Sequence, residues 1–424
     1  MLDIKFIREN PKVIKKDLEK RHEKEKLKWV DDLLKKDVEY RKLLQDNQKL
    51  RQRRNEITDE INKLKKQGED IKEKIKEAKE LPDTIKQSTE KVEELRNKIQ
   101  YYLMRLPNIL HESVPIGKDE NDNVVVKKWG TKPKFDFELK PHGELLEKLG
   151  LANFDKAAEV SGHGFYYLLG DIAKLELALI HFAVDFLTKE NYVLVEPPLM
   201  LRRKPYEGVT DLKDFETMMY KVQDEDLLLI ATSEHPIAAM LMNGIYDEKQ
   251  LPLKFVGYSP CFRKELGSHS IDTRGIFRVH HFNKIEQFVF CKPEDSWKFH
   301  EELLKNAETL FQKLKIHYRV VNVCTGDIGT VAAKKYDIEA WSPRENLYRE
   351  VVSCSNCTSY QATRLNIKYR KGKEKEFAHT LNSTAIATSR ALRAIIENYQ
   401  QKDGSIKVPT VLQKYMGKKV IAKR

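Results

Sequence analysis

The stretch FRKELGSHSIDTRGIFRVHHFNKIEQF, from Phe262 to Phe288, concentrates cations, histidines, phenylalanines and carboxylates in one span. It follows the β-like run KFVGYSPC, and the alternation of apolar and polar residues resumes after a centre that contains glycine and serine. These features predict a strand, a loop and a returning strand. Because side chains alternate between the two faces of a strand, Arg263 and Glu265 should share a face. One face of the returning strand should carry Arg278, His280, Phe282, Lys284 and Glu286.

Such a surface combines guanidinium groups, a flat aromatic ring and carboxylates. Guanidinium groups bind phosphate in a bidentate manner, an aromatic ring stacks on adenine, and a carboxylate pairs with an ammonium group. The stretch therefore fits a site for a nucleotide beside an amino acid. The charge pattern also fits an exposed antiparallel hairpin with cross-strand ion pairs, and taken alone it favours that simpler interpretation.

The chain has 424 residues, more than one hydrophobic core usually supports, so we expect two domains. No apolar run reaches the roughly eighteen residues of a membrane span, and the start of the chain lacks the apolar segment of a signal peptide. We therefore expect a cytoplasmic protein without membrane attachment. The five cysteines, an odd number, favour a reducing compartment. Cys354 and Cys357 form the only C-x-x-C pair, and because no second pair of ligands follows at a suitable spacing, no zinc site is expected.

Residues 29–105 contain one glycine, Gly68, and one proline, Pro82, and their apolar residues recur every seven positions. The two series are Leu43, Leu50, Ile57 and Leu64, and then Ile71, Ala78, Ile85, Val92 and Ile99. The pattern predicts two helices that separate at Gly68 and pair as an antiparallel coiled coil. Because proline removes a backbone donor and clashes with the preceding turn, we expect a broken tip over residues 67–83.

The formal net charge is +12, and residues 1–110 hold seven of these surplus charges, with 30 Lys and Arg against 23 Asp and Glu. Basic runs such as KLRQRR and KLKK lie along the first predicted helix. This distribution favours a polyanionic partner such as RNA. A rod or spacer with a solvated charged surface explains the same pattern equally well.

Prolines, glycine and charged residues interrupt the pattern over residues 111–140. We interpret this segment as a linker between a helical domain, residues 1–110, and a second domain, residues 141–424. In the second domain, helical segments such as IAKLELALIHFAVDFLTKE are interspersed with β-rich runs such as HYRVVNV. This order predicts an α+β fold with a mixed, mainly antiparallel sheet flanked by helices. Neither glycine-rich phosphate-binding motif occurs, so a nucleotide must be held by side chains.

The opening stretch resembles a known signature. Its F-R-x-E, followed after a loop by R-x-x-x-F, resembles the second signature of class II aminoacyl-tRNA synthetases. The fuller DTRGIFRVHHFNKIEQF is similar to the seryl-tRNA synthetase form of that signature. ATSEHP, residues 231–236, and REVVSCSNCTSYQATR, residues 349–364, also resemble segments of that family.

The two other class signatures occur in the expected order. ENYVLVEPPLML resembles the first signature, which forms a dimer interface, through Tyr192, Val195 and Pro198. LNSTAIATSRALRAIIENYQ, residues 381–400, resembles the third, a strand and a helix that bears Arg390. The resemblance covers the whole chain, because archaeal and eukaryotic-like seryl-tRNA synthetases also carry an N-terminal coiled-coil arm. It implies a class II synthetase domain after that arm.

The resemblance implies a role in ATP binding for each matching residue. Arg263 would hold the α-phosphate, Glu265 the adenine amino group and Arg278 the γ-phosphate. Phe282 would stack on adenine, and Arg390 would cover its other face and reach the γ-phosphate. The residues implied in catalysis are Arg263, Glu265 and Arg390. The implied ATP-binding set is Arg263, Lys264, Glu265, Arg278, Val279, Phe282, Glu350, Val351, Val352, Ser353 and Arg390.

The remaining roles concern serine and the metal. Glu350 and Ser353 match positions that hold Mg²⁺ against the phosphates. The implied serine-binding set is Thr232, Ser233, Glu234, Arg263, Glu286, Asn382 and Thr384. A site that hydrogen-bonds the serine hydroxyl leaves polar groups unpaired when alanine binds, which discriminates by roughly 10⁴-fold or better.

The resemblance implies an enzyme that activates L-serine with ATP to seryl-adenylate and transfers the seryl group to the 3′-terminal adenosine of tRNA(Ser), with tRNA(Sec) as a further candidate acceptor. It implies ATP and Mg²⁺ as substrate and cofactor, a homodimer, and an arm that binds the tRNA. Two alternatives remain. A ligase that charges a carrier protein would lack the arm, and a non-catalytic RNA-binding paralogue would not need the charged site residues.

Overall fold

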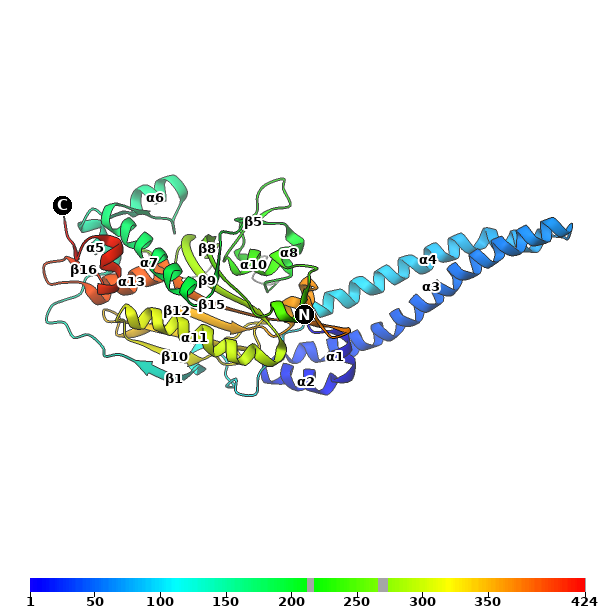
Figure 1. Cartoon of the computed structure of the whole chain (residues 1–424), viewed down its shortest axis with the longest axis horizontal. Coiled ribbons are helices and arrows are strands. Elements are labelled where there is room, and N and C mark those ends of the chain that lie inside the picture. The colour runs from blue at the N-terminus through cyan, green and yellow to red at the C-terminus, as the bar shows by residue number, and fades with distance from the viewer. Residues whose placement is uncertain (212–216, 266–273, 424) are drawn as a thin grey trace. The chain divides into compact units, whose positions relative to one another are not determined.

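The computed structural model describes residues 1–211, 217–265 and 274–423, so the loop expected at the centre of the opening stretch, residues 266–273, lies outside the described residues. The described chain divides into two compact units (Figure 1). One comprises Leu2–Leu106, and the other comprises Pro107–Arg424 together with Met1. None of the helices in these described ranges has the length and apolar character needed to cross a membrane.

The N-terminal unit is a helical arm. Its short helices are α1 (Ile4–Glu9), α2 (Pro11–Lys20) and the 3-10 turn η1 (Lys24–Lys26), and its long helices are α3 (Leu27–Gln67) and α4 (Lys72–Leu103). The predicted antiparallel coiled coil is confirmed. Gly68 ends α3 at φ 72°, a left-handed conformation that glycine adopts without a steric penalty.

The apolar seam of the arm contains a polar crossing. Ile57 in α3 and Ile85, Val92 and Ile99 in α4 are buried, as their seven-residue spacing predicts. Asn47 is also buried, and its Nδ2 donates to Thr89 Oγ1 at 3.1 Å, so this polar seam residue is satisfied across the helix pair.

The broken tip expected around Pro82 is wrong, because α4 continues through Pro82 without interruption. The proline lies on the exposed side of the helix, between the buried Leu81 and Ile85. Water can therefore bond the carbonyl that loses its helical partner, which reduces the penalty of proline in a helix. The turn needs only residues 68–71.

The second unit is built on an eight-stranded sheet in the described residues, with the order β1-β10-β11-β12-β15-β9-β8-β4. Only β4 and β8 pair in parallel among these neighbours, so the predicted mixed, mainly antiparallel sheet is confirmed. The strands are β1 (Val124–Trp129), β4 (Val193–Val195), β8 (Leu253–Phe262), β9 (His281–Cys291), β10 (Tyr318–Asn322), β11 (Lys334–Ser342), β12 (Leu347–Asn356) and β15 (His379–Ala387). Segment 111–140, interpreted above as a linker, thus supplies β1 at one edge of the sheet.

The helices of this unit flank the sheet. They are α5 (His142–Lys148), α6 (Phe154–Ser161), α7 (Gly170–Lys189), α8 (Arg203–Glu207), α10 (Glu234–Met240), α11 (Ser296–Lys313), α12 (Tyr360–Leu365), α13 (Thr388–Tyr399) and α14 (Thr410–Met416), with 3-10 turns η2 (Glu120–Asp122), η3 (Glu248–Gln250) and η4 (Pro293–Asp295). Short strands complete it: β2 (Ala152–Asn153), β3 (Tyr167–Leu168), β5 (Met200–Leu201), β6 (Leu228–Leu229), β7 (Ile245–Asp247), β13 (Lys368–Lys371), β14 (Glu374–Phe377), β16 (Ile406–Lys407) and β17 (Val420–Ile421).

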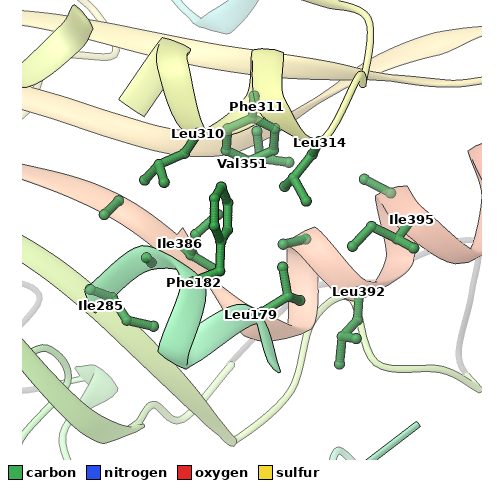
Figure 2. Packing of buried hydrophobic residues seen from close by; sticks show 14 of the residues in the cluster. Leu179, Phe182, Ile285, Leu310, Phe311, Leu314, Val351, Ile386, Leu392 and Ile395 are labelled. Atoms are coloured by element: carbon green, nitrogen blue, oxygen red, sulfur yellow. The ribbon is translucent and has the colours of Figure 1, made fainter. Parts of the chain in front are cut away.

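One face of the sheet packs against α7, α11 and α13 to form the main hydrophobic core. Figure 2 shows Phe182 of α7 pointing toward Leu310 and Phe311 of α11 within this core. Strand β9 contributes Ile285 and Val289 to the same core. The alternate residues of β9 point to the other face of the sheet, where α10 and α12 pack near one end of the strand. The rest of that second face is left for a cavity.

Candidate active site

A cavity of about 380 Å³ opens on the sheet face opposite α7 and α11. Strands β9, β12 and β15, the segment after β8 and the first turn of α13 all contribute to its wall. Most of the residues that the sequence singled out line it: Thr232, Glu234, Arg263, Glu265, Arg278, Val279, Phe282, Glu286, Glu350, Val351, Ser353, Asn382, Thr384 and Arg390. The fold thus brings together residues that are up to 158 positions apart, from Thr232 to Arg390.

Arginine side chains line the cavity from its middle to one end. The Arg263 guanidinium lies 5.4 Å from the Phe282 ring centroid, and its Nε donates to the Ala231 carbonyl at 3.3 Å. Arg278 Nη1 lies 3.8 Å from Glu265 Oε2. The backbone N–H of Arg263 donates to His280 O at 3.0 Å, which extends the β8–β9 pairing and holds the two arms of the opening stretch together.

Arg390 enters the same end from α13. This helix follows β15 directly, with Ala387 in an extended conformation before it, so the position of Arg390 is set by the strand. Arg390 Nη1 donates to Glu350 Oε1 at 2.7 Å and to the Glu350 carbonyl at 3.1 Å. Burial works against ionisation of Glu350, but Arg390 and Lys335 outweigh it and lower the pKa of the carboxyl.

The other end of the cavity holds a buried ion pair that was not assigned a role from the sequence. Lys284 Nζ lies 2.7 Å from Glu286 Oε2 and donates to Thr232 Oγ1 at 3.0 Å. Both charged side chains are almost fully enclosed, with exposed fractions of 7% for Lys284 and 1% for Glu286. Burial raises the pKa of Glu286, and Lys284 opposes that shift. Thr384 lies directly opposite Glu286 in the β15–β9 register.

A second carboxylate, Glu234, lies at this end. Its Oε1 accepts hydrogen bonds from Gln361 Nε2 at 2.7 Å and from Asn382 Nδ2 at 3.1 Å. Burial, followed by the negative charge of Glu286, raises the pKa of Glu234 to about 7. The neighbouring His235 is held neutral, because burial and the nearby Lys284 lower its pKa to about 3.

Three residues of the expected sets lie elsewhere. The Val352 side chain belongs to the hydrophobic core, and Ser233 is fully buried beside Gly257. Lys264 Nζ lies 5.4 Å from the Tyr220 ring centroid. His280 also leaves the predicted face, because β9 begins only at His281 and the His280 ring lies against Phe165 and Tyr220.

Two further residues of the cavity wall carried no role in the sequence assignment. Lys284 was predicted to share the face of Phe282 and Glu286, and it does, but its position between Glu286 and Thr232 could not be foreseen. Phe277 lies with its ring centroid 5.6 Å from the Arg390 guanidinium. No local pattern predicts this proximity, because it joins segments more than a hundred residues apart.

The residues present fit a magnesium ion at the arginine-rich end. Glu350 and Ser353 both line the cavity and offer a carboxylate and a hydroxyl oxygen, the hard ligands that Mg²⁺ prefers. Within the described ranges, no group of three or more His, Cys, Asp or Glu side chains is placed to hold a metal. The protein ligands alone would thus leave coordination positions of the ion to be filled by phosphate oxygens and water.

The chain matches two family models. Residues 1–110 match the seryl-tRNA synthetase N-terminal domain, and residues 219–399 match the tRNA synthetase class II core domain (G, H, P, S and T). The "Serine--tRNA ligase" of Methanocella arvoryzae is 60% identical over 419 residues, which cover 98% of this chain and 99% of that protein.

Two solved structures are similar over the whole chain. The seryl-tRNA synthetase from Pyrococcus horikoshii complexed with ATP is 53% identical, with a TM-score of 0.93 and coverage of 100% of both chains. The cytoplasmic serine–tRNA ligase from Naegleria fowleri in complex with AMP is 39% identical, with a TM-score of 0.87 and coverage of 100% of this chain and 99% of that one. Since both domains match and the similarity runs from end to end, the chain belongs to the seryl-tRNA synthetase family of class II aminoacyl-tRNA synthetases.

Proposed function

We propose that the cavity is the site where this serine–tRNA ligase activates L-serine with ATP, forming seryl-adenylate and pyrophosphate. The observation that carries the proposal is its division into two ends. Arg278 and Arg390 line one end, the carboxylates Glu234 and Glu286 line the other, and the charge of Arg263 acts on Glu350 as well as on Glu234 and Glu286. The first end suits a triphosphate, and the second suits the ammonium and hydroxyl groups of serine.

The reaction at this site needs positioning and neutralisation of charge more than a proton-transfer base. A carboxylate oxygen of serine attacks the α-phosphorus of ATP, a phosphorus–oxygen bond forms, and pyrophosphate leaves with the electron pair of the bond that breaks. Arg263, at the middle of the cavity, holds the α-phosphate, while Phe282 stacks on adenine and Glu265 accepts from its amino group. Arg278 and Arg390 hold the outer phosphates. When ATP binds, Arg390 releases Glu350 and binds phosphate instead.

A magnesium ion held by Glu350 and Ser353 would neutralise charge on the phosphates. Glu350 suits this role because its lowered pKa keeps the carboxylate ionised. Asp337 is buried near Glu350. Burial, together with the negative charge of Glu350, raises the pKa of Asp337 to about 7.

Serine is selected at the other end by groups that already form a connected set. Thr384 and Glu286 face each other across β15 and β9, where both a donor and an acceptor are available to the serine hydroxyl. Glu234 takes the ammonium group, with Asn382 holding the carboxylate in place. Lys284 pairs with Glu286 at 2.7 Å and opposes the rise that burial causes in its pKa. Alanine would leave buried polar groups unpaired, at a cost of about 1 to 3 kcal/mol for each.

The helical arm, residues 1–110, is proposed to bind tRNA(Ser), and residues 141–424 to form the catalytic domain. The arm carries a surplus of seven positive charges. Part of its charge is used internally, because Arg53 in α3 pairs with Glu60 at 2.8 Å and with Glu77 of α4 at 2.9 Å. Exposed lysines such as Lys65 and Lys66 near the turn are therefore better candidates for binding phosphate than the whole KLRQRR run.

A second copy of the chain is proposed to cover the edge of the sheet at β4. This strand pairs on one side only, with β8, among the described residues. Val193 and Leu194 are 60% and 50% exposed, and Leu177 of the neighbouring α7 is 56% exposed. An open apolar edge of this kind favours a two-fold interface between identical copies. Sedimentation equilibrium should give about twice the 49.7 kDa of one chain, and a stable, fully active monomer would disprove the interface.

The placement of the two substrates is tested by a pair of substitutions. Glu286→Gln keeps the shape but removes the charge that pairs with Lys284, so kcat/KM for serine in ATP–pyrophosphate exchange should fall roughly tenfold to a hundredfold, from a loss of about 1.5 to 3 kcal/mol. The KM for ATP should stay nearly unchanged. Phe282→Ala should do the converse, with weaker ATP binding and serine affinity largely kept. If Glu286→Gln impaired the use of ATP and left serine kinetics untouched, the two ends would be assigned the wrong way round.

A further inference from the structure

The chain segment that leads into β9 is packed unusually closely against α5. The backbone N–H of Ile276 donates to His142 Nε2 at 3.1 Å, and His142 is fully buried. A Cβ atom on Gly275 would lie 2.3 Å from His142 Nε2, and one on Gly143 would lie 2.6 Å from the Arg274 carbonyl oxygen. Both glycines are therefore required for this approach, and the hydrogen bond fixes the backbone two residues before Arg278.

This hydrogen bond also determines which nitrogen of His142 carries the proton. Since Nε2 accepts from the Ile276 N–H, the ring N–H lies on Nδ1. Nδ1 faces Glu397 Oε1 of α13 at 3.3 Å. Glu397 also accepts from Ser342 Oγ at 2.6 Å and from Arg393 Nε at 3.0 Å. Burial opposes ionisation of Glu397, but His142 and Arg393 outweigh it and lower its pKa to about 2.

Helix α13 holds the same segment from a second side. Arg390, Arg393 and Glu397 follow one another at spacings of three and four residues, so they share one face of the helix. The Phe277 ring centroid lies 4.4 Å from the Arg393 guanidinium and 5.6 Å from that of Arg390. Arg393 is itself held by Glu345 at 2.7 Å. Ile276 and Phe277 are therefore fixed from both sides, and the next residue, Arg278, projects into the cavity.

We propose that His142 is a positioning residue for Arg278. The contact of its Nδ1 with Glu397 orients the ring, and its Nε2 then fixes the Ile276 backbone. This arrangement aims the Arg278 guanidinium at the outer phosphates of ATP. The proposal rests on the proposed function, which places ATP at the arginine-rich end. His142 acts through the backbone and not through the substrate. Its removal should thus affect ligands that have outer phosphates and spare those that lack them.

The side-chain geometry of glutamine and asparagine offers a matched pair of substitutions. In His142→Gln the amide oxygen reaches the position of Nε2 and can still accept from the Ile276 N–H. In His142→Asn the amide reaches only the position of Nδ1, so the interaction with Glu397 is kept and the hydrogen bond to Ile276 is absent. His300→Asn serves as the control, because His300 is also fully buried, burial lowers its pKa to about 4, and its Nε2 bonds the Cys354 carbonyl at 3.1 Å. It is packed within the core and does not line the cavity.

The test measures the KM for ATP and for serine in ATP–pyrophosphate exchange, and the Kd of AMP by calorimetry, with the full-length chain. His142→Asn should raise the KM for ATP about fivefold to tenfold, the effect of one hydrogen bond, while the Kd of AMP and the KM for serine change less than about twofold. His142→Gln should recover most of the affinity for ATP. His300→Asn should lower the melting temperature without separating ATP from AMP.

A further part of the test uses the Arg278→Ala variant, which has no guanidinium at this position. There His142→Asn should cause no additional rise in the KM for ATP. If His142→Asn does not fold, Glu397→Gln replaces it in the same comparison. This variant keeps the His142 ring and removes the negative charge beside Nδ1 of that ring. A smaller rise in the KM for ATP is then expected.

The role is overturned if the affinities for AMP and ATP fall equally, if the asparagine and glutamine variants behave alike, or if the effect of His142→Asn persists in full without Arg278. A wild-type chain without serine-dependent exchange would contradict the proposed function instead. The two failures are therefore distinguishable.

Discussion

At the scale of single residues, one end of the cavity is governed by the charges that surround Glu234 and Glu286. Lys284 pairs with Glu286 at 2.7 Å, and the positive charges of Lys284 and Arg263 act on both carboxylates. The remaining carboxylate, Glu234, has its pKa raised to about 7 by burial and by the charge of Glu286. In the proposed site the ammonium group of serine would bring a further positive charge to Glu234, so we expect serine to bind best when Glu234 is ionised.

This balance predicts a pH dependence for serine. Because the pKa of Glu234 is raised above its ordinary 4.5 to about 7, the protonated carboxyl dominates below that pH and must release its proton when serine binds. The KM for serine in ATP–pyrophosphate exchange should therefore rise as the pH falls below about 7, approaching a tenfold change per pH unit, and level off above it. Glu234→Gln should show a high KM for serine with little dependence on pH. A flat profile for the wild-type enzyme would show that Glu234 is ionised throughout.

Several site residues could be predicted from the sequence, because strand alternation is a local rule. Phe282 and Glu286 share a face of β9, and Asn283 lies on the opposite face, where its Nδ2 donates to Glu176 Oε1 of α7 at 3.0 Å. The position of His280 could not be predicted, because its backbone N–H donates to Gly164 O at 2.9 Å, a hydrogen bond to a distant part of the chain. The resemblance to a family supplied the roles, and alternation supplied only the faces.

At the scale of elements, the arm shows how far periodicity reaches. The seven-residue repeat identified both long helices and their antiparallel pairing, and Gly68 marked the turn. The same reasoning failed at Pro82, because the penalty of a proline depends on whether its freed carbonyl can meet water, and that depends on the face it occupies. The edge strand β1 was missed for a similar reason: its pairing with β10 lies in residues almost two hundred positions away.

The tolerated proline leads to a prediction about the arm. Proline in a helix interior is less favourable than alanine by about 3 kcal/mol, so Pro82→Ala should stabilise α4 locally by up to that amount. Hydrogen exchange measured on the full chain should then slow for amides 83–86 by as much as roughly a hundredfold. Lys79→Ala, at an exposed position of the same helix, is the control and should change exchange little. Unchanged exchange in Pro82→Ala would mean that the helix carries no strain at this position.

At the scale of the whole molecule, the arm and the cavity belong to different units. The arm, Leu2–Leu106, is a compact unit of its own, and every residue that lines the cavity belongs to the other unit. Adenylation uses only serine and ATP, whereas the second step needs the tRNA. We therefore expect the two steps to respond differently to changes in the arm.

Deletion of about residues 30–100 should leave serine-dependent ATP–pyrophosphate exchange nearly intact and abolish charging of tRNA(Ser). As a milder variant, Lys65→Ala with Lys66→Ala should weaken tRNA binding and reduce its salt dependence, by about 0.9 in the log–log slope for each duplex phosphate that a lysine no longer neutralises. If the deletion abolished both activities, the arm would be shown to stabilise the catalytic unit instead of binding RNA.

The most direct test of serine activation is ATP–pyrophosphate exchange by the full-length wild-type chain, measured separately with serine, alanine and threonine. We predict exchange with serine at a kcat/KM roughly 10⁴-fold or more above that with alanine, because the hydroxyl satisfies polar groups that alanine leaves unpaired. Threonine should also be poor, because its extra methyl group must enter the enclosed end of the cavity beside Glu286 and Thr384. Comparable exchange with alanine, or no exchange with serine, would contradict the assignment of this cavity as the site of serine activation.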